Sequence, residues 1–288
     1  MGRCFRSDLL LQSLTYDQTS PMPTDTPAEL KEKAKTLWSG FIPMEMVTAS
    51  VAPKLVAFAG IEPGLRVLDV GCGTGVVAMT AARKGARVTG ADLTPALLER
   101  ARENASIMGL EVEFHESDVE ALPFAEGSFD VVVSQFGHMF APNPAQATAE
   151  MLRVLKPGGT IAFSTWPPEL MIGRFFALLA SYGPPAPAGA TSPILWGEPS
   201  VVRERLGSAV RNLTFDRAMM RVQTLSVQHQ RHAFETGVGP MSVVMKALSA
   251  TDPARLAQLR QELDALFEEY FVDNHLRQDF LLSRAVKC

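Results

Sequence analysis

Residues 67–75, Val-Leu-Asp-Val-Gly-Cys-Gly-Thr-Gly, restrict the possible folds more than any other segment. An apolar strand leads into a glycine-rich turn, and residues 76–84 follow with the small and apolar side chains of a helix. Glycines allow a tight turn and a close approach of the backbone to a ligand, and free N–H groups at a helix start can bind a carboxylate or phosphate. The segment therefore predicts a nucleotide-type ligand site.

The glycine spacing indicates which kind of site this is. In the dinucleotide-binding pattern G-x-G-x-x-G the third glycine would fall at Val76, although Asp92 does provide the acid expected further on. Glycines at alternate positions behind an acid instead resemble motif I of the class I methyltransferases, which use S-adenosylmethionine. That resemblance implies cofactor contacts from Asp69, Gly71, Cys72, Gly73 and Gly75.

The second predicted strand continues the resemblance. Residues 88–92 form a short strand that ends in a carboxylate, and in the family this acid holds both ribose hydroxyls, with Leu93 beside it. An ionised carboxylate suits this role because it has two oxygens and only accepts hydrogen bonds. The alternative is a helix-capping acid. We expect a ribose contact at Asp92 because Thr94 and Pro95 already supply a cap and a first helical turn.

A third strand is predicted over residues 111–118, where an alternating pattern ends at Asp118. Class I methyltransferases commonly use this acid to accept a hydrogen bond from the adenine amino group, while the next backbone amide contacts the ring. The resemblance therefore implies adenine contacts at Asp118 and Val119. The alternative for Asp118 is an ordinary turn residue.

The fourth strand, residues 129–134, is nearly all apolar, as expected for a strand buried on both faces. Its carboxyl end lies where open α/β sheets form ligand crevices, so Ser134 and Gln135 are predicted to contact the cofactor. Methyltransferases of exocyclic nucleobase amines usually carry a polar residue, two prolines and an aromatic residue here. This chain does not, which argues against a nucleobase amine as the acceptor. A Pro-Gly-Gly turn at 157–159 and a strand at 160–164 match the family's last core motif.

His138 is the predicted catalytic base. The sulfonium of the cofactor makes its methyl group electrophilic, so the protein must hold a nucleophile in line with the methyl group and exclude water. A phenol, hydroxyl or acidic carbon gains from a base matched to neutral pH, and His138 follows the fourth strand, where a side chain can enter the crevice. A hydrogen-bonded structural histidine is the alternative.

An apolar acceptor pocket is predicted beside this histidine. Its expected lining is Phe136, Met139, Phe140 and Trp166. Further candidates, for which core packing is the alternative, are Met44, Met46, Met171, Phe175 and Trp196. Trp38 is a candidate to place its aromatic face against the cation of the cofactor, again with core packing as the alternative.

Composition agrees with a single enzyme core. The chain has 288 residues, of which 47% are hydrophobic, enough to bury a full α/β core with an attached cap. The formal charge is −4, which implies no basic surface for nucleic acid. Three distant cysteines show no metal-ligand spacing, and no apolar run of about 18 residues could span a bilayer. We expect no metal, a cytoplasmic location and no membrane insertion; the oligomeric state stays open.

Four regions are expected from the pattern of elements. Residues 1–27 resemble a flexible arm, and residues 28–60 should form a helical lid that is broken at Gly40 and Pro43. Residues 61–165 form the cofactor-binding core, and residues 166–288 complete the sheet and add a helical cap over 229–270. The expected C-terminal strands begin near 212 and 279, and residues 182–199 read as a long loop.

The prediction is therefore an α/β, Rossmann-like, doubly wound and mostly parallel seven-stranded sheet with an antiparallel last strand and helical lid elements. The resemblance implies methyl transfer from S-adenosylmethionine to a small, apolar or aromatic acceptor at oxygen or carbon, and the core resembles the ubiquinone and menaquinone biosynthesis methyltransferases. Two alternatives stay open: an NAD-dependent oxidoreductase, and a noncatalytic cofactor-binding partner subunit.

Overall fold

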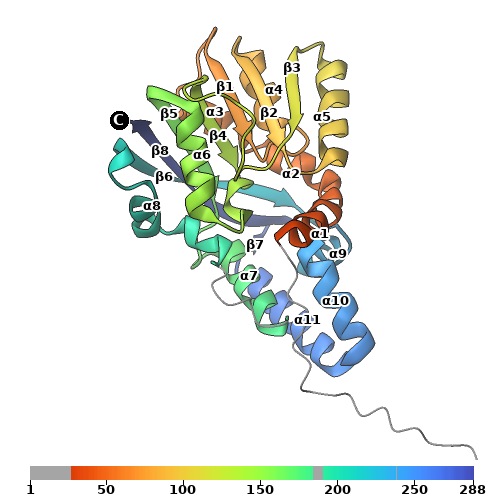
Figure 1. The fold of residues 1–288 in the computed structure, drawn as a ribbon. Helices are drawn as coiled ribbons and strands as arrows, with labels where there is room; N and C mark the ends of the chain where they lie inside the picture. The colour runs from red at the N-terminus through yellow and green to blue at the C-terminus, as the bar shows by residue number, and fades with distance from the viewer. Residues whose placement is uncertain (1–26, 184–190, 238) are drawn as a thin grey trace, which may run out of the picture.

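The computed structural model describes residues 27–183, 191–237 and 239–288, and a twisted sheet lies at its centre (Figure 1). Its strands within these residues are β1 (Arg66–Val70), β2 (Arg87–Asp92), β3 (Val112–Glu116), β4 (Phe129–Gln135), β5 (Leu155–Thr165), β6 (Val210–Gln223), β7 (Phe271–Val272) and β8 (His275–Lys287). They lie in the order β3-β2-β1-β4-β5-β8-β6, and the short β7 pairs with β8. Strands β1 to β5 are parallel, whereas β8 runs antiparallel to β5 and β6. The predicted Rossmann-like sheet with an antiparallel last strand is confirmed.

Helices cover both faces of the sheet and extend beyond one end of it (Figure 1). They are α1 (Pro27–Ser39), α2 (Glu45–Ala49), α3 (Ala52–Phe58), α4 (Val76–Arg83), α5 (Pro95–Met108), α6 (Pro144–Val154), α7 (Met171–Tyr182), α8 (Pro199–Leu206), α9 (Val227–Gly237), α10 (Gly239–Thr251) and α11 (Pro253–Glu268). Helices α7, α9, α10 and α11 pack together, and α1 contacts both α5 and α10. None of the described helices is long and apolar enough to cross a membrane.

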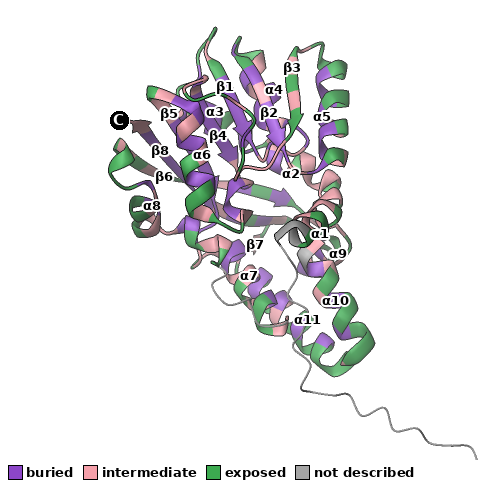
Figure 2. Cartoon of the chain, viewed as in Figure 1, coloured by how far each residue is buried: buried purple, intermediate pink, exposed green. Residues whose placement is uncertain are grey.

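The central strands are buried on both faces, as Figure 2 shows by colour. In β4, the side chains of Val131, Val132 and Val133 are at most 3% exposed, because helices lie over both faces of the parallel sheet. Strands β1 and β4 are neighbours, but the chain continues from β1 to β2 on one side and from β4 to β5 on the other, so the connections after these two strands lead in opposite directions. Ligands of open α/β sheets bind in the crevice at this switch point.

The structure corrects four local expectations. The Pro-Gly-Gly segment at 157–159 belongs to β5, where it forms a bulge between the partners of Phe129 and Val131. Thr94 precedes α5, but its side chain makes no capping hydrogen bond. Strand β8 begins at His275, earlier than expected, and the segment 182–199 contains a short 3₁₀ helix, η3 (Pro193–Gly197). The arm at 1–26 and the loop residues 184–190 lie outside the described residues.

The glycine turn after β1 touches the segment after β4 through two glycines. A Cβ on Gly137 would lie 2.6 Å from the carbonyl oxygen of Gly71 and 2.9 Å from its Cα. Gly71 itself has a φ of 62°, in the left-handed region that favours glycine. Contact between the two backbones therefore requires the absence of a side chain at both positions.

We expect Gly137→Ala to lower the free energy of unfolding by roughly 1–3 kcal/mol, because the methyl group overpacks a rigid backbone contact. Urea denaturation of both proteins measures the difference. Gly237→Ala, at the end of α9, is the matched control, because no described atom lies within 4 Å of its new Cβ. Equal stability of the two variants would show that the Gly71–Gly137 contact does not constrain the fold.

Candidate functional site

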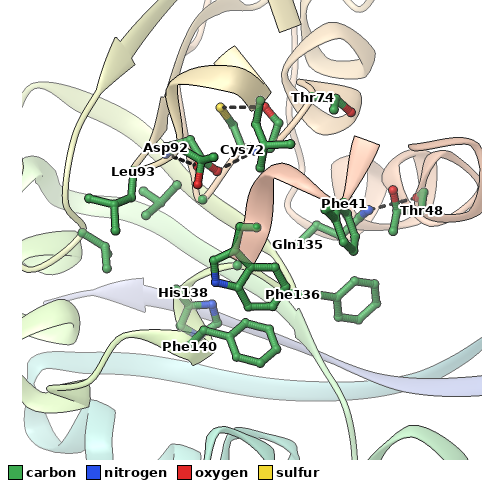
Figure 3. A pocket seen from close by; sticks show the side chains of 18 of the residues that line it. Phe41, Thr48, Cys72, Thr74, Asp92, Leu93, Gln135, Phe136, His138 and Phe140 are labelled. Atoms are coloured by element: carbon green, nitrogen blue, oxygen red, sulfur yellow. Dashed lines mark hydrogen bonds between the residues drawn. The ribbon is translucent and has the colours of Figure 1, made fainter. Parts of the chain in front are cut away.

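One cavity of about 250 Å³ joins the glycine turn to a group of aromatic side chains (Figure 3). It lies at the carboxyl ends of β1, β2 and β4, and helices α1, α7 and α9 and strands β6 and β8 close it. The predicted site residues that line it are Asp69, Gly71, Cys72, Gly73, Asp92, Leu93, Asp118, Val119, Gln135, Phe136, His138, Phe140 and Trp166. The topology therefore brings together residues that are far apart in the sequence.

Asp92 connects the end of β2 to the glycine turn. Its Oδ2 accepts a hydrogen bond of 2.8 Å from the N–H of Gly73, and its Oδ1 accepts one of 2.8 Å from the N–H of Thr94. The side chain is buried, and this burial raises the pKa of the carboxyl group above its ordinary value. Each carboxylate oxygen still has a lone pair for a ligand. Asp92 thus has a structural task in addition to any ligand contact.

Asp69 is the second buried acid of the cavity. Its Oδ2 accepts a hydrogen bond of 3.0 Å from the N–H of Ala78 in α4, while its Oδ1 has no partner among the described residues. Burial raises its pKa to about 8, and the charge of nearby Asp92 adds to the effect. Two such carboxyl groups favour a ligand that brings positive charge.

The glycine turn leaves space and keeps the cysteine unreactive. Gly73 has a φ of 55°, and no atom of the described chain lies within 4 Å of where its Cβ would be, so the turn offers open volume to a ligand. Cys72 is buried, and burial together with the charges of Asp92 and Asp69 raises the pKa of its thiol well above the ordinary value. Its thiol therefore stays protonated and is not an activated nucleophile.

Asp118 lies under helix α1. It forms an ion pair with Lys31 of that helix, and its Oδ1 accepts a hydrogen bond of 2.9 Å from the N–H of Glu120. Lys31 also binds the Glu120 carboxylate at 3.0 Å, and Lys35, one turn further on, binds Glu116 at 2.9 Å. Helix α1 therefore covers the part of the cavity where adenine was predicted to bind.

His138 is a neutral, buried ring. It is 2% exposed and packs against Phe163 and Trp196, with ring centroids 4.5 Å and 4.7 Å away. Burial lowers its pKa to about 3, and the charge of Arg205 acts in the same direction. Neither ring nitrogen has a hydrogen-bond partner within the described ranges. The imidazole can therefore accept a hydrogen bond at neutral pH but is a weak base.

The aromatic part of the cavity begins at Phe136, directly after β4. This residue has a φ of 58°, a strained conformation for a bulky side chain, and its N–H donates to the carbonyl of Ser164 at 3.1 Å. Its ring stacks on Trp166 with a centroid distance of 3.8 Å and an interplanar angle of 9°. Trp38 of α1 also lines the cavity, and its ring centroid lies 4.6 Å from that of Phe140.

Gln135 points into the cavity next to helix α2 (Figure 3). Its Nε2 donates a hydrogen bond of 2.9 Å to the carbonyl oxygen of Thr48, whereas its Oε1 is buried with no partner in the part of the chain that the structure describes. Ser134, its neighbour, has a structural contact instead: its hydroxyl donates to Val70 at 2.6 Å and accepts from the N–H of His138 at 3.0 Å.

Three predicted site residues, Gly75, Ser134 and Met139, are not among the residues that line the cavity. Of the further apolar candidates, Trp38, Met44 and Phe175 line it, whereas Met171 and Trp196 are core residues and Met46 is 77% exposed. The sequence did not single out these lining residues: Lys31, Thr48, Phe176, Met220, Phe234 and Gln278. The periodicity of their helices and strands gave the only available signal, and it does not distinguish a cavity wall from a core.

The chain is similar both to a family model and to individual known proteins. A family model described as a methyltransferase domain matches residues 68–163. An uncharacterised protein of Mycobacterium tuberculosis is 36% identical over 274 residues, which are 92% of this chain and 100% of that protein. The demethylmenaquinone methyltransferase of Thermus thermophilus is 43% identical over 105 residues, covering 36% of this chain and 48% of that enzyme.

The fold also matches solved structures. The YcgJ protein of Bacillus subtilis superposes with a TM-score of 0.55 at 20% identity, covering 84% of this chain and 98% of that chain. The family match spans the glycine turn, both acids that follow it and the strand before His138, which are the elements that build the cavity. The chain therefore belongs to the class I S-adenosylmethionine-dependent methyltransferases.

Proposed function

We propose that the protein methylates a small, apolar or aromatic acceptor at an oxygen or carbon atom. The observation that carries this proposal is the single cavity in which the glycine turn and its acids continue into a wall of aromatic rings. The similarity to a demethylmenaquinone methyltransferase supports an apolar ring as the acceptor. The same argument makes a small molecule, rather than a nucleic acid, the partner.

The residues present fit S-adenosylmethionine by charge and by space. Its sulfonium and ammonium groups suit the buried acids Asp69 and Asp92, whose oxygens have remaining lone pairs. The open volume at Gly73 suits a ligand close to the backbone. We infer that Asp92 holds the ribose hydroxyls, that Asp118 and Val119 contact the adenine, and that the free Oδ1 of Asp69 attracts the ammonium group.

Catalysis then depends on position and on the exclusion of water. When bound, the cofactor supplies an electrophilic methyl group. The ring stack of Phe136 and Trp166 and the helix α1 residue Trp38 keep the reacting region apolar and dry. With a hydroxyl acceptor, His138 accepts a hydrogen bond from the O–H group and takes its proton as methylation makes the oxygen strongly acidic. With a ring-carbon acceptor, His138 takes the proton that the methylated carbon releases.

Ligand-dependent melting tests the cofactor and separates the alternatives. S-adenosylmethionine and S-adenosylhomocysteine at about a hundred times their dissociation constants should each stabilise the protein by roughly 2.7 kcal/mol, whereas NAD should not. At one fixed ligand concentration, the gain should be larger near pH 8.5 than near pH 6.5, because Asp69, with a pKa of about 8, is mostly ionised at the higher pH and mostly protonated at the lower one.

Stabilisation by NAD alone would contradict the methyltransferase assignment and favour the oxidoreductase. A panel of phenols, naphthols and hydroxybenzoates with methyl-labelled S-adenosylmethionine completes the test. Cofactor binding without transfer to any acceptor of this class would favour the noncatalytic partner subunit.

The ribose role of Asp92 is tested with a pair of ligands. The wild-type protein should bind adenosine at least tenfold more tightly than 2′,3′-dideoxyadenosine, because charge-assisted hydrogen bonds contribute roughly 1.5–3 kcal/mol. Asp92→Asn should remove most of this preference. Calorimetry measures both affinities, and melting monitors the loss of the Gly73 contact.

Asp130→Asn is the matched control, because Asp130 also accepts a backbone hydrogen bond, from Arg66 at 2.8 Å, but does not line the cavity. A folded Asp92→Asn protein that keeps the full preference for adenosine would remove the ribose assignment.

The role of His138 is tested with His138→Phe, which keeps an aromatic ring against Phe163 and Trp196 but removes both nitrogens. We expect its single-turnover rate with an acceptor from the panel to fall by roughly 10²-fold, with nearly unchanged cofactor affinity. The wild-type rate should show no inflection due to this histidine between about pH 5 and 8, because a pKa of about 3 leaves the ring neutral throughout.

His115→Phe, on an exposed position of β3, is the control for a lost imidazole. A His138→Phe protein with the wild-type rate would make His138 a structural residue.

A further inference from the structure

The cavity extends from the glycine turn into a chamber walled by the C-terminal part of the chain. We define this distal chamber by the lining residues Trp166, Ile172, Phe175, Phe176, Met220, Phe234 and Gln278. Its rings contact one another: the centroid of Phe175 lies 4.9 Å from that of Phe234 and 5.5 Å from that of Phe176. Such a wall suits a ligand with an apolar ring.

Gln278 is the one amide side chain among these seven lining residues. It lies in β8 opposite Met220 of β6, and it is 2% exposed. Its Nε2 has no hydrogen-bond partner among the described residues. A buried amide donor without a partner costs free energy, so a group that accepts its hydrogen bond is expected in the cavity.

Gln278 lies on the same face of the sheet as a ring that contacts Phe136 and Trp166. Side chains two residues apart in a strand share a face of the sheet, so Gln278 and Phe280 lie on the same face of β8. The ring centroid of Phe280 lies 5.8 Å from that of Phe136 and 6.4 Å from that of Trp166. The amide therefore belongs to the same wall as the Phe136–Trp166 stack.

We propose that Gln278 determines acceptor specificity: its side-chain amide forms a hydrogen bond with an oxygen substituent on an otherwise apolar, ring-bearing acceptor. This inference rests on the proposed function and narrows it, from an apolar acceptor to a ring compound with a hydroxyl or carbonyl oxygen. An amide can donate and accept, so it suits both groups. A ring without the oxygen would leave the Gln278 donor unpaired, and the chamber discriminates against it for that reason.

The test uses the whole 288-residue chain with S-adenosylhomocysteine and two probes, 2-naphthol and 2-methylnaphthalene, which has a methyl group in place of the hydroxyl. The wild-type protein should bind 2-naphthol roughly tenfold more tightly, and Gln278→Met, of similar size and shape, should lose most of this preference. Gln223→Met is the matched control, because Gln223 is exposed in the neighbouring strand β6 and should leave the tenfold preference intact.

Equal binding of the two probes by the wild-type protein would overturn the inference even if Gln278→Met failed to fold. A folded Gln278→Met protein that keeps the full tenfold preference for 2-naphthol would overturn it as well. Stabilisation by S-adenosylhomocysteine is measured in every protein. If S-adenosylhomocysteine does not stabilise the wild-type protein, the result counts against the proposed function. If it does stabilise the wild type, but the wild type binds both probes equally, the result counts only against the role of Gln278.

Discussion

The carboxylate of Asp92 is the contact on which the cofactor end of the cavity depends. It accepts hydrogen bonds from the amides of Gly73 and Thr94, and it thereby fixes the glycine turn to the end of β2 and to the start of α5. The glycine turn leads directly into α4, where the N–H of Ala78 donates a hydrogen bond to Asp69. Because these acids hold the backbone as well as face the cavity, the shape of the site and its charge have the same origin.

Burial gives the acids beside the glycine turn their chemistry. The pKa values of Asp69 and Asp92 are both raised, because water is excluded and, for Asp69, because a like charge lies nearby. The same exclusion keeps the Cys72 thiol protonated and the His138 imidazole neutral. The cavity therefore contains no strong base or activated nucleophile among its described lining residues, which agrees with catalysis through positioning.

The sequence predicted the core well because its signals are local. A buried parallel strand, a glycine turn and an acid at a strand end each lie within a few residues, and their order fixes the sheet. The distal chamber was not predictable in the same way, because β8, β6, α7 and α9 meet only through tertiary packing. Gln278 reads as an ordinary strand residue, and Ser134 reads as a ligand group although its hydroxyl holds Val70 and His138. The charge of Arg205, which acts on His138, likewise comes from a distant helix.

Helix α1 has contacts at both ends of the cavity. Lys31 holds the acid at the cofactor end, and Trp38, two turns along the same helix, packs against Phe140 in the aromatic part. One helix therefore covers both the cofactor end and the aromatic part of the cavity. A substitution that shifts α1 would change the surroundings of both parts at once, so the two ends of the site are not structurally independent.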